Sequence, residues 1–65
     1  MNSYEYYEPC FLEVKKILRK KGVSWKKAVV AFPIEEMVHW FKTGNMCRRV
    51  AEAVLLRIKD NKKEN

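Results

Sequence analysis

Residues 22–44 have the sequence Gly-Val-Ser-Trp-Lys-Lys-Ala-Val-Val-Ala-Phe-Pro-Ile-Glu-Glu-Met-Val-His-Trp-Phe-Lys-Thr-Gly. The chain's only two glycines bound this segment, and Pro33 divides it because proline disfavours the helical conformation in the residue before it. Ser24 is a favourable N-cap for a helix over residues 25–31. Proline is also tolerated in the first turn of a second helix, over residues 33–42. We therefore predict two short helices joined by a tight turn.

Apolar side chains in the second of these helices recur at helical spacing. Four of them occupy positions i, i+3, i+4 and i+7 and form one stripe, namely Ile34, Met37, Val38 and Phe41. A helix-turn-helix needs a small residue in its first helix and apolar residues in its second that lock the two at a steep angle. Ala28 supplies the small residue, and Val38 and Phe41 supply the lock. The segment is typical of a helix-turn-helix.

Further helices are expected on both sides of this segment. Pro9 suits the first turn of a helix that Gly22 ends. Its apolar face consists of Phe11, Val14, Ile17 and Leu18. Asn45 can cap a last helix, whose predicted buried residues are Met46, Val50, Ala53, Val54 and Ile58. The predicted fold class is therefore all-α, a compact four-helix domain that contains a helix-turn-helix.

A chain of 65 residues has room for one domain. We predict a flexible N-terminal arm over residues 1–8, the helix-turn-helix domain over residues 9–60 and a disordered tail over residues 61–65. A chain of this size buries only about 60% of the surface that its unfolded form exposes. Dimerisation would add to so thin a margin of stability.

The charge of the chain is positive and unevenly distributed. It carries 14 Lys and Arg against 8 Asp and Glu, for a net charge of +6. Seven basic residues follow one another with no acid between them, namely Lys15, Lys16, Arg19, Lys20, Lys21, Lys26 and Lys27. Such a block is an electrostatic footprint for nucleic acid or an anionic membrane, or else a solvated helix face.

The two cysteines, Cys10 and Cys47, are too few and too far apart for a zinc ribbon or a redox Cys-x-x-Cys motif. We expect two reduced thiols, a cytoplasmic location, no metal and no cofactor. The first ten residues do not resemble a signal peptide. No apolar run approaches the ~20 residues that cross a bilayer, so membrane insertion is not expected.

The order of these elements resembles that of the small helix-turn-helix regulators of phages and mobile elements, which include lambda-repressor-like domains and anti-CRISPR-associated regulators. The shared run is a basic helix, Gly22-Val23-Ser24, then Ala28, an apolar turn at Phe32-Pro33, and the segment from Val38 to Gly44. This resemblance covers about residues 11–58. It implies a sequence-specific double-stranded DNA-binding regulator, a repressor acting as a homodimer.

The resemblance also implies which residues meet DNA. The helix over residues 33–42 would enter the major groove, with contacts from Glu35 or Glu36, His39, Lys42 and Thr43. A glutamate there would accept a hydrogen bond from cytosine N4. Phosphate contacts would come from Ser24, Trp25, Lys26, Lys27, Arg48 and Arg49; these fix the register without reading sequence.

Other interpretations of the same residues stay open. Glu35 and Glu36 would stabilise a helix simply by lying in its first turn, where the helix dipole favours acids. Together with the two tryptophans, Trp25 and Trp40, they also suggest an acidic-aromatic helix, Glu35 to Phe41, that binds a partner protein, as in a small adaptor or inhibitor. An enzyme is not expected. The sequence offers no Ser-His-Asp set beyond the single His39, no Gly-rich phosphate loop and no cluster of metal ligands.

Overall fold

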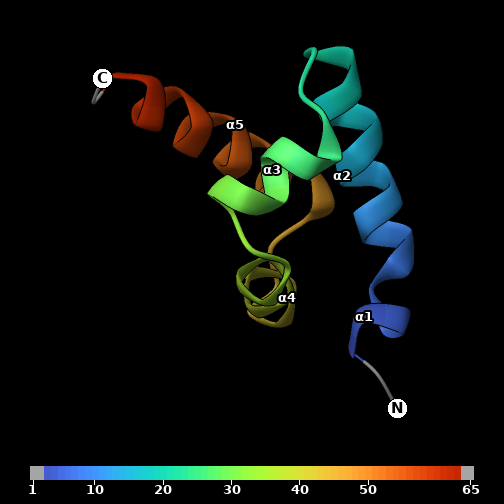
Figure 1. Cartoon of the computed structure of the whole chain (residues 1–65). Coiled ribbons are helices and arrows are strands. Elements are labelled where there is room, and N and C mark those ends of the chain that lie inside the picture. Colours follow the sequence, from blue (N-terminus) through green and yellow to red (C-terminus); the bar gives the residue numbers. More distant parts are fainter. Residues whose placement is uncertain (1–2, 64–65) are drawn as a thin grey trace.

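The computed structural model describes residues 3–63 and, within them, the side chains of residues 5–61. This part of the chain is helical and contains no strand. A four-residue helix, α1 (Ser3–Tyr6), precedes four longer ones, which are α2 (Glu8–Lys20), α3 (Trp25–Ala31), α4 (Ile34–Lys42) and α5 (Cys47–Lys63) (Figure 1). The predicted all-α fold of four helices is confirmed.

Most helix ends lie where the sequence predicts them. Helix α3 has the predicted bounds, and the Lys27 N–H donates to Ser24 Oγ at 3.2 Å as an N-cap requires. Helix α2 ends just before Gly22 and α4 just before Gly44, whose φ angles of 76° and 91° are the left-handed values that glycine adopts readily. Pro33 is the N-cap of α4, so that helix begins one residue later than predicted.

The two ends of the chain differ from the prediction. The expected N-terminal arm contains α1 and the first residue of α2, and the Tyr7 ring packs 5.4 Å from that of Phe41. Helix α5 continues to Lys63, although a tail was expected from residue 61; residues 1–2 and 64–65 lie outside the described part. Met46 was expected to be buried, but it precedes α5 and is 75% exposed.

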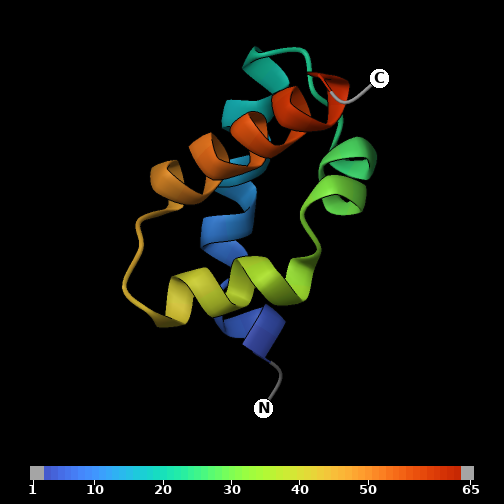
Figure 2. The same cartoon turned by 90° about the vertical axis from the view of Figure 1, so that its left-hand side faces the viewer.

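The core lies chiefly between α2 and α5, which cross in Figure 2, with α5 in front. Its buried residues are Phe11, Val14, Leu18, Ala28, Phe32, Met37, Phe41, Val50, Ala51 and Val54. The predicted apolar faces of α2 and α4 are therefore confirmed for the residues that are buried, namely Phe11, Val14 and Leu18 on α2 and Met37 and Phe41 on α4. The flanking residues Ile17, Ile34, Val38, Ala53 and Ile58 are partly buried against this core.

Helices α3 and α4 cross steeply. Helix α4 is seen end-on in Figure 1 and lengthwise in Figure 2, whereas α3 lies across the view in Figure 1. Phe41, one of the two residues predicted to lock them, packs its ring 5.3 Å from that of Phe11 on α2. Both helices pack on α5. A steep crossing occurs in many small helical domains, so the helix-turn-helix itself stays a prediction.

The turn between α3 and α4 is fixed by Phe32, which is completely buried. Its ring meets the Trp40 ring at 5.6 Å, edge to face. The Arg57 guanidinium of α5 lies over the same ring, 4.2 Å from its centre. Aromatic and cation–π contacts of this kind orient a ring as well as burying it. The turn is therefore held by α5, with no glycine in it.

Cys10 and Cys47 form a disulfide that joins the N-terminal turn of α2 to the first residue of α5. Their Cα atoms are 5.2 Å apart, within the range that a disulfide spans. The prediction of two reduced thiols is therefore wrong. It rested on the absence of a signal peptide and the cytosolic location inferred from that, whereas the packing of α2 on α5 brings the two residues together across 37 positions.

Candidate nucleic-acid interface

The basic block predicted from the sequence is divided between α2, the following turn and α3. Lys16, Arg19, Lys20 and Lys21 are exposed near the C-terminal end of α2, which lies at the opposite end of the molecule from α4 in Figures 1 and 2. Lys15 behaves differently, since its ammonium lies 5.0 Å from the centre of the Trp25 ring. The four exposed residues Lys16, Arg19, Lys20 and Lys21 therefore form one basic end of the molecule.

Within the described residues, Arg57 is the only cation in a salt bridge. The exposed lysines and arginines of the basic end have no carboxylate partner there. An unpaired ammonium or guanidinium keeps its full attraction for phosphate, because no internal acid has to be displaced first. The basic end can therefore attract a polyanion without breaking an internal salt bridge.

The residues predicted at the start of α3 have different environments. Lys26 and Lys27 are exposed. Ser24 is exposed too, but its Oγ already accepts the helix-capping hydrogen bond. Trp25 is partly buried and packs edge to face on Phe11, with ring centres 6.0 Å apart. The lysines are therefore free for phosphates, whereas Trp25 serves the core.

The two glutamates that open α4 have separate roles. Glu35 is exposed and forms no hydrogen bond or ion pair with another described residue. Glu36 accepts two hydrogen bonds from Arg57, each 2.7 Å long. These bonds, helped by the guanidinium charge and opposed by partial desolvation, lower the pKa of the Glu36 carboxyl. Glu36 therefore ties α4 to α5, and only Glu35 is free to face a base.

The Glu36–Arg57 pair makes stability depend on pH in a definite direction. Because the pKa of Glu36 is lower in the folded state than its ordinary 4.5, the ionised carboxylate stabilises the fold above that pH, and the effect is lost as pH falls through the folded value. We expect Glu36→Gln to lower the melting temperature at pH 7 by the equivalent of at most about 1 kcal/mol, since the pair is partly exposed.

The measurement compares melting curves of the two proteins at pH 7 and well below pH 4.5. Glu35→Gln is the matched control, because it makes the same chemical change one residue away, where the described residues offer no hydrogen-bond or ion-pair partner. A Glu36→Gln difference that persists undiminished in acid would contradict the assigned pair, as would an equal effect of Glu35→Gln.

A polar pocket of about 310 Å³ lies at the C-terminal end of α4. It is lined by His39, Trp40, Thr43, Asn45 and Arg49. The Asn45 amide donates to Thr43 Oγ1 at 2.9 Å and to the Trp40 carbonyl at 3.0 Å, and the Thr43 hydroxyl donates to that carbonyl at 2.9 Å. These bonds fix the loop, and the side chains of His39 and Arg49 take no part in them.

The structure thus brings some predicted residues together and separates others. His39, Thr43 and Arg49 share the polar pocket, with exposed Lys42 and Arg48 adjacent in sequence. Ser24, Lys26 and Lys27 line a second depression between α3 and α5. Sequence reasoning missed Asn45 as a pocket residue and Arg57 as the partner of Glu36. Only the Asn45 position, directly after the helix-ending glycine, offered a signal.

Other kinds of site find little support in the described residues. No group of three His, Cys, Asp or Glu side chains there could hold a metal ion. No helix in this part of the chain is long and apolar enough to cross a bilayer. A comparison of the chain with protein-family models, curated proteins and solved structures finds no match.

Proposed function

We propose that this chain is a transcriptional regulator that binds double-stranded DNA, a helix-turn-helix repressor acting as a homodimer, of the kind found in phages and mobile elements. The observation that carries the proposal is that the cations proposed to contact DNA are exposed and form no salt bridge within the described residues, on a chain of net charge +6; they are Lys26, Lys27, Lys42, Arg48 and Arg49. A polyanion releases counterions when it meets such cations, and this drives binding to DNA of any sequence.

The proposal divides the predicted contacts into two kinds. Lys26 and Lys27 on α3 contact phosphates and set the register, as do Arg48 and Arg49 on α5. The outer face of α4 reads bases, because the exposed residues Glu35, His39 and Lys42 recur at i, i+4 and i+7 and so share that face. Glu36 and Trp25 are not among the proposed contacts, since both are engaged within the fold.

The alternative of an acidic-aromatic α4 surface for a partner protein has less support. Its motivating residues were the paired glutamates and the two tryptophans. Glu36 is bound by Arg57, Trp40 packs on Phe32 and Phe41 is buried. What stays exposed on α4 is one glutamate with a histidine and a lysine, which favours DNA over a basic protein partner.

The cytoplasm is the proposed location, because a DNA-binding regulator of this kind works where the genome lies. Thiols there are kept largely reduced, whereas Cys10 and Cys47 form a disulfide in the structure. DNA binding should therefore be measured with the protein both oxidised and reduced.

We expect the double change Lys26→Ala, Lys27→Ala to weaken binding to all duplexes alike. If each lysine neutralises one phosphate, the slope of log K against log salt becomes shallower by about 1.8, since each contact contributes about 0.9. The measurement is fluorescence anisotropy with labelled duplexes, first those selected from random and genomic fragments and then unrelated ones, over a series of salt concentrations.

His39→Ala is the comparison variant, because it alters the proposed base-reading face without removing a lysine. It should change the ranking of duplexes more than the salt slope. The proposed function fails if wild-type protein retains no duplex at near-physiological salt. The assignment of Lys26 and Lys27 fails if their removal affects one sequence only.

A further inference from the structure

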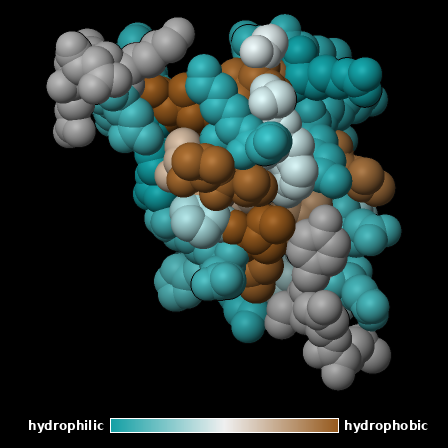
Figure 3. Space-filling view, in the orientation of Figure 1, coloured by the Kyte–Doolittle hydropathy of each residue, from teal (hydrophilic) through white to brown (hydrophobic). Residues whose placement is uncertain are grey.

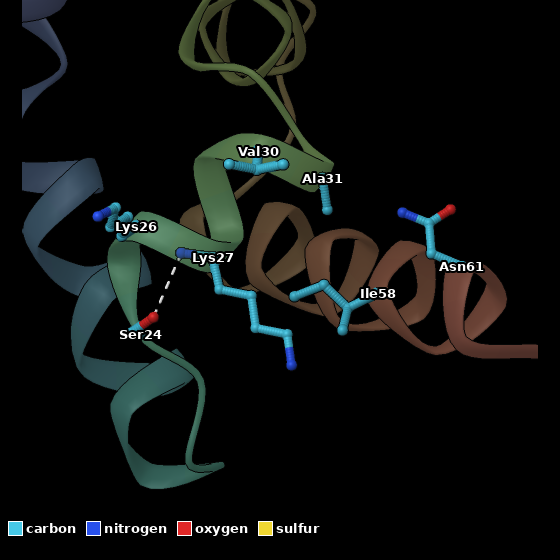
Figure 4. A pocket seen from close by; sticks show the side chains of 7 residues that line it. All are labelled: Ser24, Lys26, Lys27, Val30, Ala31, Ile58 and Asn61. Carbon is cyan, nitrogen blue, oxygen red and sulfur yellow. Dashed lines mark hydrogen bonds between the residues drawn. The ribbon is translucent and has the colours of Figure 1, made fainter. Parts of the chain in front are cut away.

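An apolar groove of about 440 Å³ runs between α3 and the C-terminal half of α5, away from the polar pocket. It is lined by Ser24, Lys26, Lys27, Val30, Ala31, Ile58 and Asn61. Figure 3 shows hydrophobic surface exposed over α3 and continuing towards α5. In Figure 4, Ile58 points from α5 towards the Lys27 side chain of α3. The groove therefore combines an apolar surface, formed by Val30, Ala31 and Ile58, with two lysines at one side.

One apolar side chain of the groove is largely exposed to solvent. Val30 is 80% exposed, although the helix that carries it is otherwise packed on α5. Covering an exposed valine is favourable by about 25 cal/mol for each Å² removed from water. A small molecule bound against Ile58 would leave the Val30 side chain exposed to water. An occupant that gains from all of this surface must be large enough to cover Val30 as well as Ile58.

The charges around the groove restrict what that occupant can be. Lys26 and Lys27 line it, and no acidic residue among those that the structure describes does so. Two copies of the groove placed face to face, as in a two-fold symmetric dimer, would bring four lysines together, and like charges at an interface are costly. Charge complementarity therefore favours an acidic occupant over a second copy.

Helix α3, which forms one wall of the groove, is long enough to lie along a partner helix. The seven residues of α3 span about 10 Å at 1.5 Å per residue, which is two turns of a partner helix. Helices that bind in grooves present apolar side chains on one face and use flanking charges for specificity. We propose that this groove binds an acidic amphipathic helix of a partner protein, with apolar side chains between Val30 and Ile58 and carboxylates at Lys26 and Lys27.

This binding site goes beyond the proposed DNA binding and does not depend on it. The two activities share Lys26 and Lys27, so an acidic helix in the groove would compete with phosphates for the same ammonium groups. Such a partner would act as an antagonist of DNA binding. The groove itself is best tested with DNA absent, so that the two proposals can fail separately.

The test uses the oxidised full chain and three designed helical peptides of about two to four turns. One carries leucines flanked by glutamates, the second has lysines in place of the glutamates, and the third has serines in place of the leucines. Methyl NMR spectra report on the groove through Val30 and Ile58, with buried Val14 as the internal reference. We expect the Val30 and Ile58 signals to move with the first peptide only.

Reversing the charge of the groove lysines gives a second and more specific test of the proposal. Lys26→Glu, Lys27→Glu should weaken the acidic peptide at least tenfold and make the basic peptide the better ligand. Lys20→Glu, Lys21→Glu is the matched control, with the same change of charge outside the groove lining. Val30→Ser should also weaken binding without unfolding the chain, because the side chain is exposed.

Three results would overturn the proposal. The first is a lack of shifts at Val30 and Ile58 with the acidic peptide at millimolar concentration. The second is an equal loss of binding in the two charge-reversed proteins, which would indicate attraction by overall charge alone. The third is movement of these signals with a DNA duplex but not with the peptide, which would make the groove part of a DNA interface.

Discussion

Replacing both Cys10 and Cys47 by serine is expected to lower the free energy of unfolding by about 4 kcal/mol. The disulfide closes a loop between residues 37 positions apart. Losing the constraint that such a loop places on the unfolded chain costs between about 3 kcal/mol for 15 residues and 4.7 kcal/mol for 100. Since 1 kcal/mol shifts the melting temperature of so small a domain by about 4–8 °C, the loss amounts to about 15–30 °C.

Thermal melts followed by circular dichroism measure this effect. The oxidised wild type, the reduced wild type and the double serine variant should be compared in one buffer. The last two should melt at similar temperatures, well below the first. Equal melting temperatures for oxidised and reduced wild type would show that the bond between α2 and α5 does not form in solution or does not stabilise the fold.

Replacing Phe41 by alanine is expected to cost about 3–5 kcal/mol, the range for removing a buried aromatic side chain. Phe41 is only 6% exposed. Its ring contacts those of Tyr7 and Phe11, so that its loss opens a cavity where α4 meets α2. A 65-residue domain has a small margin of stability. Much of the population should therefore unfold at room temperature, most of all in the reduced protein.

Urea denaturation of the oxidised protein gives the free energy difference directly. Tyr6→Ala is the matched control, because it also removes an aromatic ring but at a site that is 70% exposed. Exposed substitutions of this kind usually change stability by less than about 0.5 kcal/mol. Equal effects of the two variants would contradict the packing of α4 against α2.

The helices could be predicted because their signals are local. The Ser24 cap, the Pro33 break and the two glycines act within one or two turns of where they stand, and the predicted ends of α3 needed no correction. Phe32 was predicted only as part of a turn, yet it is completely buried. Its burial depends on Arg57 and Trp40, which periodicity within a single helix cannot reveal.

The candidate site was harder to predict because its key contacts join distant parts of the chain. Glu36 and Arg57 are 21 residues apart, and Cys10 and Cys47 are 37 apart. Neither spacing identifies a pair, since each depends on how α5 lies against the rest of the fold. Exposure of Glu35, Lys26 and Lys27 was predictable, because charged residues are rarely buried without a partner.

The disulfide also changes the covalent topology of the molecule. The chain from Cys10 to Cys47 forms a closed covalent ring, and α5 continues from the end of that ring to Lys63. The ring contains α3, α4 and every proposed DNA contact except Arg48 and Arg49, which follow directly after it. A single backbone break anywhere inside it, for example at the lysine-rich turn near Gly22, leaves one covalent molecule.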